Sequence, residues 1–234
     1  LVVDHGVERV KQGTIETELI EAKVYEDMCA LFNLAVVKGA EKNSASTKPT
    51  LKLASALARA TIMSTYHLYE AYLNGIALDF LIEKYDTLPV ETIELLYEWD
   101  FNKNRSKYIK LRDKALQYPK IVTNSPHPPL QESNCAELKI VLSHAKWYRD
   151  AVAHPSAAWP ISTVTNLQAN KFSEMNETKE TTFASLTTDR LTEIVDAVLV
   201  VIRKTDAIVS PTSTRVGWIV DRASDGLFPD TAFA

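Results

Sequence analysis

Apolar residues recur at spacings of three and four along most of this 234-residue chain, and only 6 residues are Gly. Such spacing is typical of amphipathic helices, whose apolar faces pack against one another. We therefore predict an all-α fold, a bundle of roughly four to six helices with few strands or none.

The longest predicted helix runs from about Leu51 to Lys84, and we expect it to be the central helix of the bundle. Its apolar side chains step by four and three, which predicts one continuous buried stripe. The stripe consists of Ile62, Tyr66, Tyr69, Leu73, Ile76 and Phe80. An earlier helix is predicted from about Thr14 to Val37. Its expected buried face consists of Ile20, Val24, Met28, Leu31 and Ala35.

Two shorter helices are predicted next, from Leu88 to Trp99 and from Asn104 to Gln117, and the second is strongly basic. A Pro-rich break follows from Pro119 to Pro129. Helical periodicity resumes at about Asn134, which has the spacing of a capping box with Glu137. The buried face of this helix is expected to consist of Leu138, Val141, Ala145, Tyr148 and Val152.

Pro155 should end that helix, because the residue before a proline is pushed out of the α region. Residues 156–185 lack helical periodicity and are predicted to form a long loop. The last helix should begin after Thr187 as its N-cap, where Leu186 and Leu191 have the spacing of a hydrophobic staple. Its expected buried face consists of Leu191, Ile194, Val195, Val198, Ile202 and Val209.

This pattern predicts one domain in three parts. Residues 1–50 form a helix and loop packed on the core, residues 51–210 form the bundle with the 156–185 loop as an insertion, and residues 211–234 form a tail. No apolar run approaches the roughly 18 residues that a membrane helix needs, so no membrane partner is expected.

Composition narrows the class of protein. Cys29 and Cys135 stand far apart, without the spacing of a disulfide framework or a zinc site, so a reducing cytoplasmic location and no metal or other cofactor are expected. The net charge of −4 argues against a protein that coats nucleic acid indiscriminately, although it allows a local basic groove.

The best candidate for chemistry lies at the end of the helix that Pro155 closes. Arg149 and His154 are five residues apart there, and Asp150 is four residues before His154, so its carboxylate can orient the imidazole and raise its pKa. Arginine suits bidentate binding of phosphate. A histidine beside it supplies acid–base chemistry, so the pair suffices to cut RNA by 2′-OH attack without a metal. The alternative is that the two cations only stabilise the helix C-terminus, by about 0.3 to 1 kcal/mol.

This segment resembles the Arg-x4-His signature of the HEPN superfamily, in which a polar residue such as Asp150 commonly follows the arginine. The stretch from Ser64 to Asn74 looks like the early core helix of these domains, and the order of helices is similar from Leu51 to Val209. The resemblance implies a homodimer in which two motifs face each other across a cleft, usually as a metal-independent endoribonuclease.

Many HEPN proteins are toxins or antiviral-defence effectors, so a cognate antitoxin or regulatory protein is a candidate partner. The resemblance implies that His154 acts as the acid/base, that Arg149 stabilises the pentavalent phosphorane and that Asp150 orients His154. Some toxin members carry a modified Tyr two residues after the histidine. Here Pro155 and Ser156 follow, so that mode of control is not expected.

Two further features are candidates to serve the same site. His67, Glu70 and Asn74 form a polar row on the long helix. In one interpretation Glu70 pairs with Arg149 while His67 or Asn74 touches substrate, and in the other the row is a solvated flank.

The second feature is a basic run with interleaved Tyr108 and Tyr118. Its cations are Lys103, Arg105, Lys107, Lys110, Arg112, Lys114 and Lys120. The run is either an RNA path or a solvated helix face. Overall, the rival to a nuclease is a non-catalytic module that dimerises through the motif helix and binds RNA or a protein. A regulatory domain of a larger defence protein is a third possibility.

Overall fold

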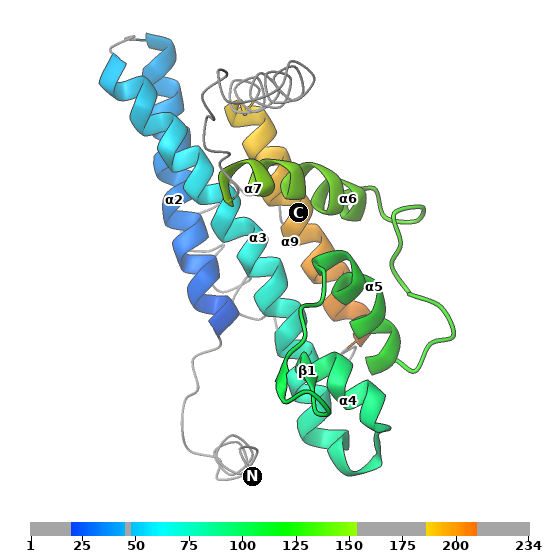
Figure 1. The fold of residues 1–234 in the computed structure, drawn as a ribbon. Helices are drawn as coiled ribbons and strands as arrows, with labels where there is room; N and C mark the ends of the chain where they lie inside the picture. The colour runs from blue at the N-terminus through cyan, green and yellow to red at the C-terminus, as the bar shows by residue number, and fades with distance from the viewer. Residues whose placement is uncertain (1–19, 45–47, 154–185, 210–234) are drawn as a thin grey trace, which may run out of the picture.

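The computed structural model describes residues 20–44, 48–153 and 186–209, and all structural statements below concern this part of the chain (Figure 1). Helices dominate it, and its sheet is one two-stranded hairpin, so the predicted all-α class is confirmed at that level. The predicted loop 156–185 and the predicted tail lie outside the described residues.

The long helices α2 (Ile20–Ser44) and α3 (Lys48–Lys84) run antiparallel and side by side (Figure 1). On α3 the predicted stripe is buried from Ile62 to Ile76, and Phe80 is partly buried against the core. On α2 the predicted Met28 and Ala35 are buried, Val24 and Leu31 are only partly buried, and the prediction was wrong at Ile20, which is 69% exposed. The buried face of α2 is formed by Tyr25, Met28, Cys29, Phe32 and Ala35.

The error on α2 has a geometric cause. Successive steps of four residues advance about 400° around a helix, so a stripe built only from such steps drifts by about 40° at each step. The predicted stripe reaches Met28 from Ile20 by two such steps, so Ile20 lies off the buried face. The observed face alternates steps of three and four and continues to point at the core.

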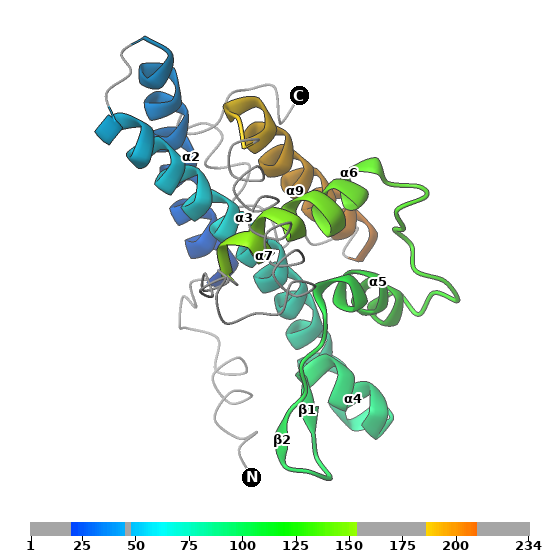
Figure 2. The ribbon, with the colours of Figure 1, turned by 45° about the horizontal axis from the view of Figure 1, so that its top comes forward.

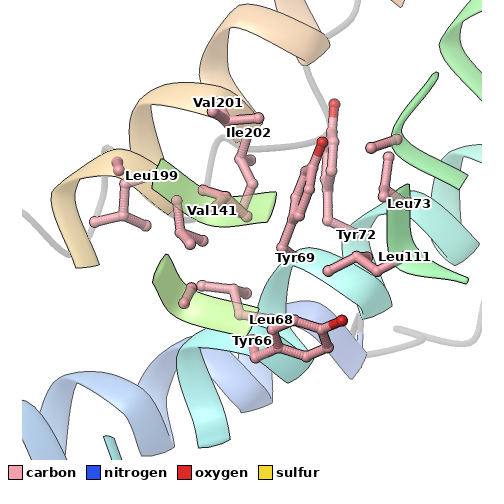
Figure 3. Close-up of a cluster of buried hydrophobic side chains, with 14 of the residues drawn as sticks. Tyr66, Leu68, Tyr69, Tyr72, Leu73, Leu111, Val141, Leu199, Val201 and Ile202 are labelled. Carbon is pink, nitrogen blue, oxygen red and sulfur yellow. The ribbon is translucent and has the colours of Figure 1, made fainter. Parts of the chain in front are cut away.

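The last described helix, α9 (Thr188–Val209), packs along α3, and its side chains form a large part of the core (Figure 3). Thr187 is its N-cap as predicted, because its Oγ1 accepts a hydrogen bond of 3.2 Å from the Arg190 N–H. Leu186 packs against the core and Leu191 is buried. The predicted face is buried from Leu191 to Ile202 and partly buried at Val209.

Beyond α3 the chain forms several short elements at one end of the molecule (Figure 2). These are η1 (Tyr85–Thr87), α4 (Val90–Tyr97), β1 (Trp99–Asp100), β2 (Arg105–Ser106) and α5 (Leu111–Val122). The strands β1 and β2 pair antiparallel as a small hairpin beside α4.

The predicted basic helix from Asn104 was therefore wrong at both ends. Asn104 has a φ of 47°, in the left-handed region that Asn adopts more easily than most residues, and this conformation closes the hairpin instead of starting a helix. Pro119 lies inside α5, and it is buried together with Tyr118, so tertiary packing outweighs the proline's lost hydrogen bond. The loop starts later, after Asn124 ends the helix with a φ of 51°.

One continuous helical segment crosses α3 and α9 (Figures 1 and 2). It comprises α6 (Ala136–Lys139), the π-helical segment η2 (Ile140–Ala145) and α7 (Lys146–Ala153). The predicted buried side chains Leu138, Val141, Ala145 and Tyr148 are confirmed, and the side chain of Val152 is outside the described residues.

The predicted capping box at this helix was wrong. Cys135 is the N-cap and makes no side-chain cap. The Asn134 side chain instead accepts a hydrogen bond from the Gln131 N–H at 2.7 Å, and Glu137 bonds to Lys204. Among the helices that the structure describes, none combines the length and apolar composition needed to cross a bilayer.

Candidate nucleic-acid interface

A pocket of about 350 Å³ lies where α3, the start of α5 and the crossing helix meet. Its lining is Tyr66 from α3, Tyr108, Lys110, Leu111 and Arg112 around the start of α5, Leu142 from η2, and Lys146 and Arg149 from α7. The pocket thus joins the predicted motif helix to part of the predicted basic run. We call it the Arg149 pocket.

Arg149 is held against Tyr66 by two contacts. Its Cζ lies 4.4 Å from the centroid of the Tyr66 ring, and its Nη2 donates a hydrogen bond of 3.0 Å to the Tyr66 hydroxyl oxygen. Burial raises the pKa of Tyr66, while the hydrogen bond from Arg149 acts in the opposite direction. Figure 3 shows Tyr66 pointing away from Tyr69 and Tyr72, which stand side by side. The phenol therefore serves as a platform that orients the guanidinium.

The π-helical segment η2 directly precedes α7, the helix that carries Arg149. The backbone N–H of Lys146 bonds to the carbonyl of Val141, five residues earlier, which is the π pattern. The pocket is lined by Leu142 of η2 and by Lys146 and Arg149 of α7, while Tyr148 of α7 faces the core. Single π turns inside α-helices are frequent at functional sites.

Other cations surround the arginine. Lys110, Arg112 and Lys146 are exposed on the pocket wall. Arg112 Nη2 lies 2.5 Å from Glu132 Oε1, and its side chain remains 62% exposed. The start of α5 adds the partial positive charge of a helix N-terminus that has no side-chain cap. Clustered cations of this kind favour the binding of an anionic ligand.

Two predicted roles are corrected by a buried ion cluster beside the pocket. Lys114 is only 2% exposed, and its Nζ lies 2.8 Å from Glu70 Oε1 and 2.5 Å from Glu98 Oε1. Lys114 is therefore not an RNA-binding residue, because a buried ammonium between carboxylates cannot reach a phosphate. Glu70 does not hold Arg149 either, since its bond is to Lys114.

The rest of the polar row lies around this cluster. Asn74 Oδ1 accepts a hydrogen bond of 3.1 Å from Lys114 Nζ, so Asn74 supports the ion cluster. His67 is exposed and is not among the residues that line the Arg149 pocket. The row is thus neither the predicted Arg149 partner nor a purely solvated flank.

The remaining cations of the basic run do not line the pocket. Lys103, Arg105 and Lys107 are exposed on and beside the hairpin, which projects from the end of the molecule (Figure 2). Lys120 lies at a different hollow, between α5 and the end of α3. Tyr118 is buried, with its hydroxyl 3.1 Å from Glu98 Oε1. Of the two tyrosines interleaved in the basic run, Tyr108 lines the pocket and Tyr118 does not.

Part of the predicted catalytic set is not described. His154 and the side chain of Asp150 lie outside the described residues, so the structure tests neither. Tyr148, which lies on the motif helix next to Arg149, is 3% exposed and packs in the hydrophobic core, so it is not available to a dimer interface. Lys146 was missed by sequence reasoning, although its position three residues before Arg149 puts the two side chains on one helix face.

Among the described residues, no three His, Cys, Asp or Glu side chains gather as a set of metal ligands. Comparison with protein-family models, with curated proteins and with solved structures gives no match to this chain.

Proposed function

We propose that this chain is an endoribonuclease that needs no metal and binds the RNA backbone in the Arg149 pocket. The observation that carries the proposal is the meeting of the motif arginine with the basic run. Arg149 and Lys146 share one pocket with Lys110 and Arg112, which come from a distant part of the chain. Clustered cations with an exposed aromatic are what an RNA strand requires of a binding surface.

The proposed mechanism needs one charge-stabilising group and one proton-transfer group. The 2′-OH loses its proton to a base and attacks the adjacent phosphorus, and the 5′-oxygen of the next nucleotide leaves with a proton. His154 is proposed as the acid/base and Arg149 as the group that stabilises the phosphorane. Asp150 is proposed to orient His154. The products are a 2′,3′-cyclic phosphate and a 5′-hydroxyl.

The biological setting is part of the same proposal. The HEPN resemblance supports a homodimeric cytoplasmic toxin or antiviral-defence effector, restrained by an antitoxin or regulatory protein. Dimerisation would place two Arg149 pockets in one assembly. Trp147, which precedes Tyr148 and Arg149, is 46% exposed and is a side chain of the type that anchors protein interfaces.

Cleavage of a labelled RNA in EDTA tests the proposal, with the product ends identified by mass spectrometry. We expect cyclic phosphate ends, no cleavage of DNA, and no turnover by His154→Ala at unchanged helix content. Asp150→Asn should only slow the reaction, because orientation is a smaller effect than proton transfer. A strict requirement for Mg²⁺ would overturn the mechanism.

A second candidate is an RNA-binding module without cleavage. The contact between Arg149 and Tyr66 favours it, because packing on a buried ring gives this arginine a structural role that needs no catalysis. Measuring RNA binding and RNA cleavage on the same preparation distinguishes the two candidate functions. Wild-type protein that binds RNA tightly, yet leaves it uncut in all conditions where it is folded and dimeric, is the binding module.

A further inference from the structure

The two tyrosines of the Arg149 pocket differ in what covers their rings. Tyr66 is 4% exposed, and the Arg149 guanidinium lies over its face. Tyr108 is 77% exposed, on the segment between β2 and α5. Both line the same pocket, and the charge of Tyr108 is one of the smaller causes that raise the pKa of Tyr66. Among the described residues that line the pocket, Tyr108 is therefore the one whose aromatic face a ligand can reach.

Two segments carry the cations that line the pocket, residues 108–112 before and at the start of α5 and residues 146–149 on α7. Lys146 and Arg149 lie one turn apart on α7, so their charged groups can bind the same phosphate or two neighbouring ones. Lys110 is two residues from Tyr108, on the other of the two lining segments. A ligand that spans both segments needs an anionic part and a flat aromatic part.

The size of the pocket favours a nucleotide unit over a protein surface. Its volume of about 350 Å³ lies within the range of roughly 300 to 1,000 Å³ of pockets that hold small ligands. A stable protein partner instead covers a broad area, on the order of 1,200 Å² or more in total. One nucleotide of a longer strand supplies the anion, the flat ring and the correct size.

We propose that Tyr108 is the base-stacking residue of the Arg149 pocket and that Lys146 is a second phosphate-binding residue beside Arg149. This inference rests on the proposed function, because it takes the ligand to be RNA. Base stacking on an aromatic side chain is sequence-tolerant, so Tyr108 should contribute to affinity without selecting one base.

Fluorescence anisotropy with a labelled 2′-O-methyl oligouridylate of about 12 nucleotides measures the role of Tyr108, since this probe spans a typical binding site and lacks the attacking hydroxyl. Tyr108→Ala should weaken binding roughly 5- to 140-fold, the range for loss of one stacked base. Tyr108→Phe should bind like wild type, because it keeps the ring. Tyr97→Ala is the matched control, since Tyr97 is 46% exposed on α4 and does not line the pocket.

An abasic oligonucleotide of the same length separates stacking from a general loss of affinity. It carries the same phosphates without bases, so wild type and Tyr108→Ala should bind it equally. If Tyr108→Ala weakens both probes to the same extent, the residue does not stack on a base, and its proposed role is overturned.

Lys146 is tested by the salt dependence of the same binding. Lys146→Ala should weaken binding and lower the slope of log affinity against log salt by about one, as expected for the loss of one phosphate contact. Lys139→Ala, an exposed lysine earlier in the same helical segment and outside the pocket, should leave the slope unchanged. Equal slopes for Lys146→Ala and wild type would contradict the second phosphate contact.

The outcomes distinguish this inference from the proposed function. If RNA is bound and Arg149→Ala abolishes cleavage, while Tyr108→Ala and Lys146→Ala behave as wild type, the two new roles fail and the nuclease stands. If folded wild-type protein binds none of these probes, the pocket is not an RNA site and both proposals fall together.

Discussion

Lys114 Nζ lies 2.8 Å from Glu70 Oε1 in a side-chain cluster that joins α5 to α3. Its second carboxylate, Glu98, lies at the C-terminus of α4 with a φ of 55° and also bonds to Tyr118. Burial and the neighbouring Glu98 charge raise the pKa of Tyr118. The cluster fixes the position of α5, and with it the wall of the Arg149 pocket.

Removing the ammonium from this cluster should be costly. Lys114→Met leaves two carboxylates facing each other, and we expect a loss of about 3 kcal/mol in the free energy of unfolding, the lower part of the range for broken buried pairs. The two carboxylates are partly exposed, so water offsets part of their repulsion and the loss in stability stays near the lower limit of that range. Urea denaturation measures it.

Two control variants sharpen this test. Lys110→Ala changes an exposed lysine of the same segment and should shift stability by less than about 0.5 kcal/mol. Combining Lys114→Met with Glu70→Gln and Glu98→Gln removes all the charges and should recover most of the stability. A Lys114→Met protein as stable as wild type would show that the cluster does not position α5.

A second prediction concerns Tyr66, whose ring lies under the Arg149 guanidinium. Tyr66→Phe keeps the ring under the guanidinium and removes one hydrogen bond, so it should destabilise the protein by about 0.5 to 1.5 kcal/mol and slow RNA cleavage. Tyr66→Ala also removes a buried ring and should cost about 3 to 5 kcal/mol. Thermal unfolding and cleavage rates measure both. Full cleavage activity in folded Tyr66→Ala would rule out the platform role.

A third prediction concerns pH. The hydrogen bond from Lys204 lowers the pKa of Glu137 from 4.5 to about 2. Because the pKa of Glu137 is lowered in the folded protein, this bond stabilises the folded state fully when the pH is above the ordinary pKa of 4.5. The stabilisation is lost as the pH falls from 4.5 toward 2. Both side chains are substantially exposed, so the contribution is only about 0.2 to 1 kcal/mol.

Glu137→Gln should therefore be less stable than wild type at neutral pH and equally stable near the acid end of that range. Unfolding in urea across the pH series measures the difference. Glu83→Gln, an exposed carboxylate on α3, is the control and should match wild type throughout. A difference that persists unchanged at the lowest pH would exclude the ion pair as its cause.

A fourth prediction concerns assembly. The exposed indole of Trp147 packs on Tyr148, with ring centroids 5.2 Å apart, beside the pocket helix. If this helix forms the proposed two-fold interface, Trp147→Ala should raise the dimer dissociation constant by roughly 30-fold or more, the effect of an interface hot spot. Sedimentation equilibrium measures it, with exposed Tyr85→Ala as control. A wild-type monomer at micromolar concentration would exclude this interface.

Regular periodicity explains which parts of the fold were predictable. The α3 stripe through Tyr69 and the α9 stripe through Val198 repeat at three and four, and both are buried as predicted. The start of α5 was not predictable in this way, because the left-handed backbone at Asn104 and the hairpin override the helical propensity of the residues around it. The π pattern at Val141 likewise leaves no signal in apolar spacing.

The candidate site divides along similar lines. Sequence singled out Arg149, Lys110 and Arg112, which the fold brings to one pocket. It assigned Lys114 to the same surface, because a run of cations does not reveal that one member meets carboxylates from α3 and α4. Such a pairing depends on contacts between distant segments, which spacing along one helix cannot encode.

The proposed role of Arg149 is to stabilise charge on the RNA phosphate during cleavage, and the single-turnover rate of Arg149→Ala measures that role. We predict a rate lower by a factor on the order of 100 to 1,000, the usual effect of removing one group that stabilises transition-state charge. Arg59→Ala should cut at the wild-type rate, because Arg59 bonds to Ser55 and does not line the pocket. A folded Arg149→Ala protein that cleaves RNA as fast as wild type would exclude Arg149 from the cleavage step.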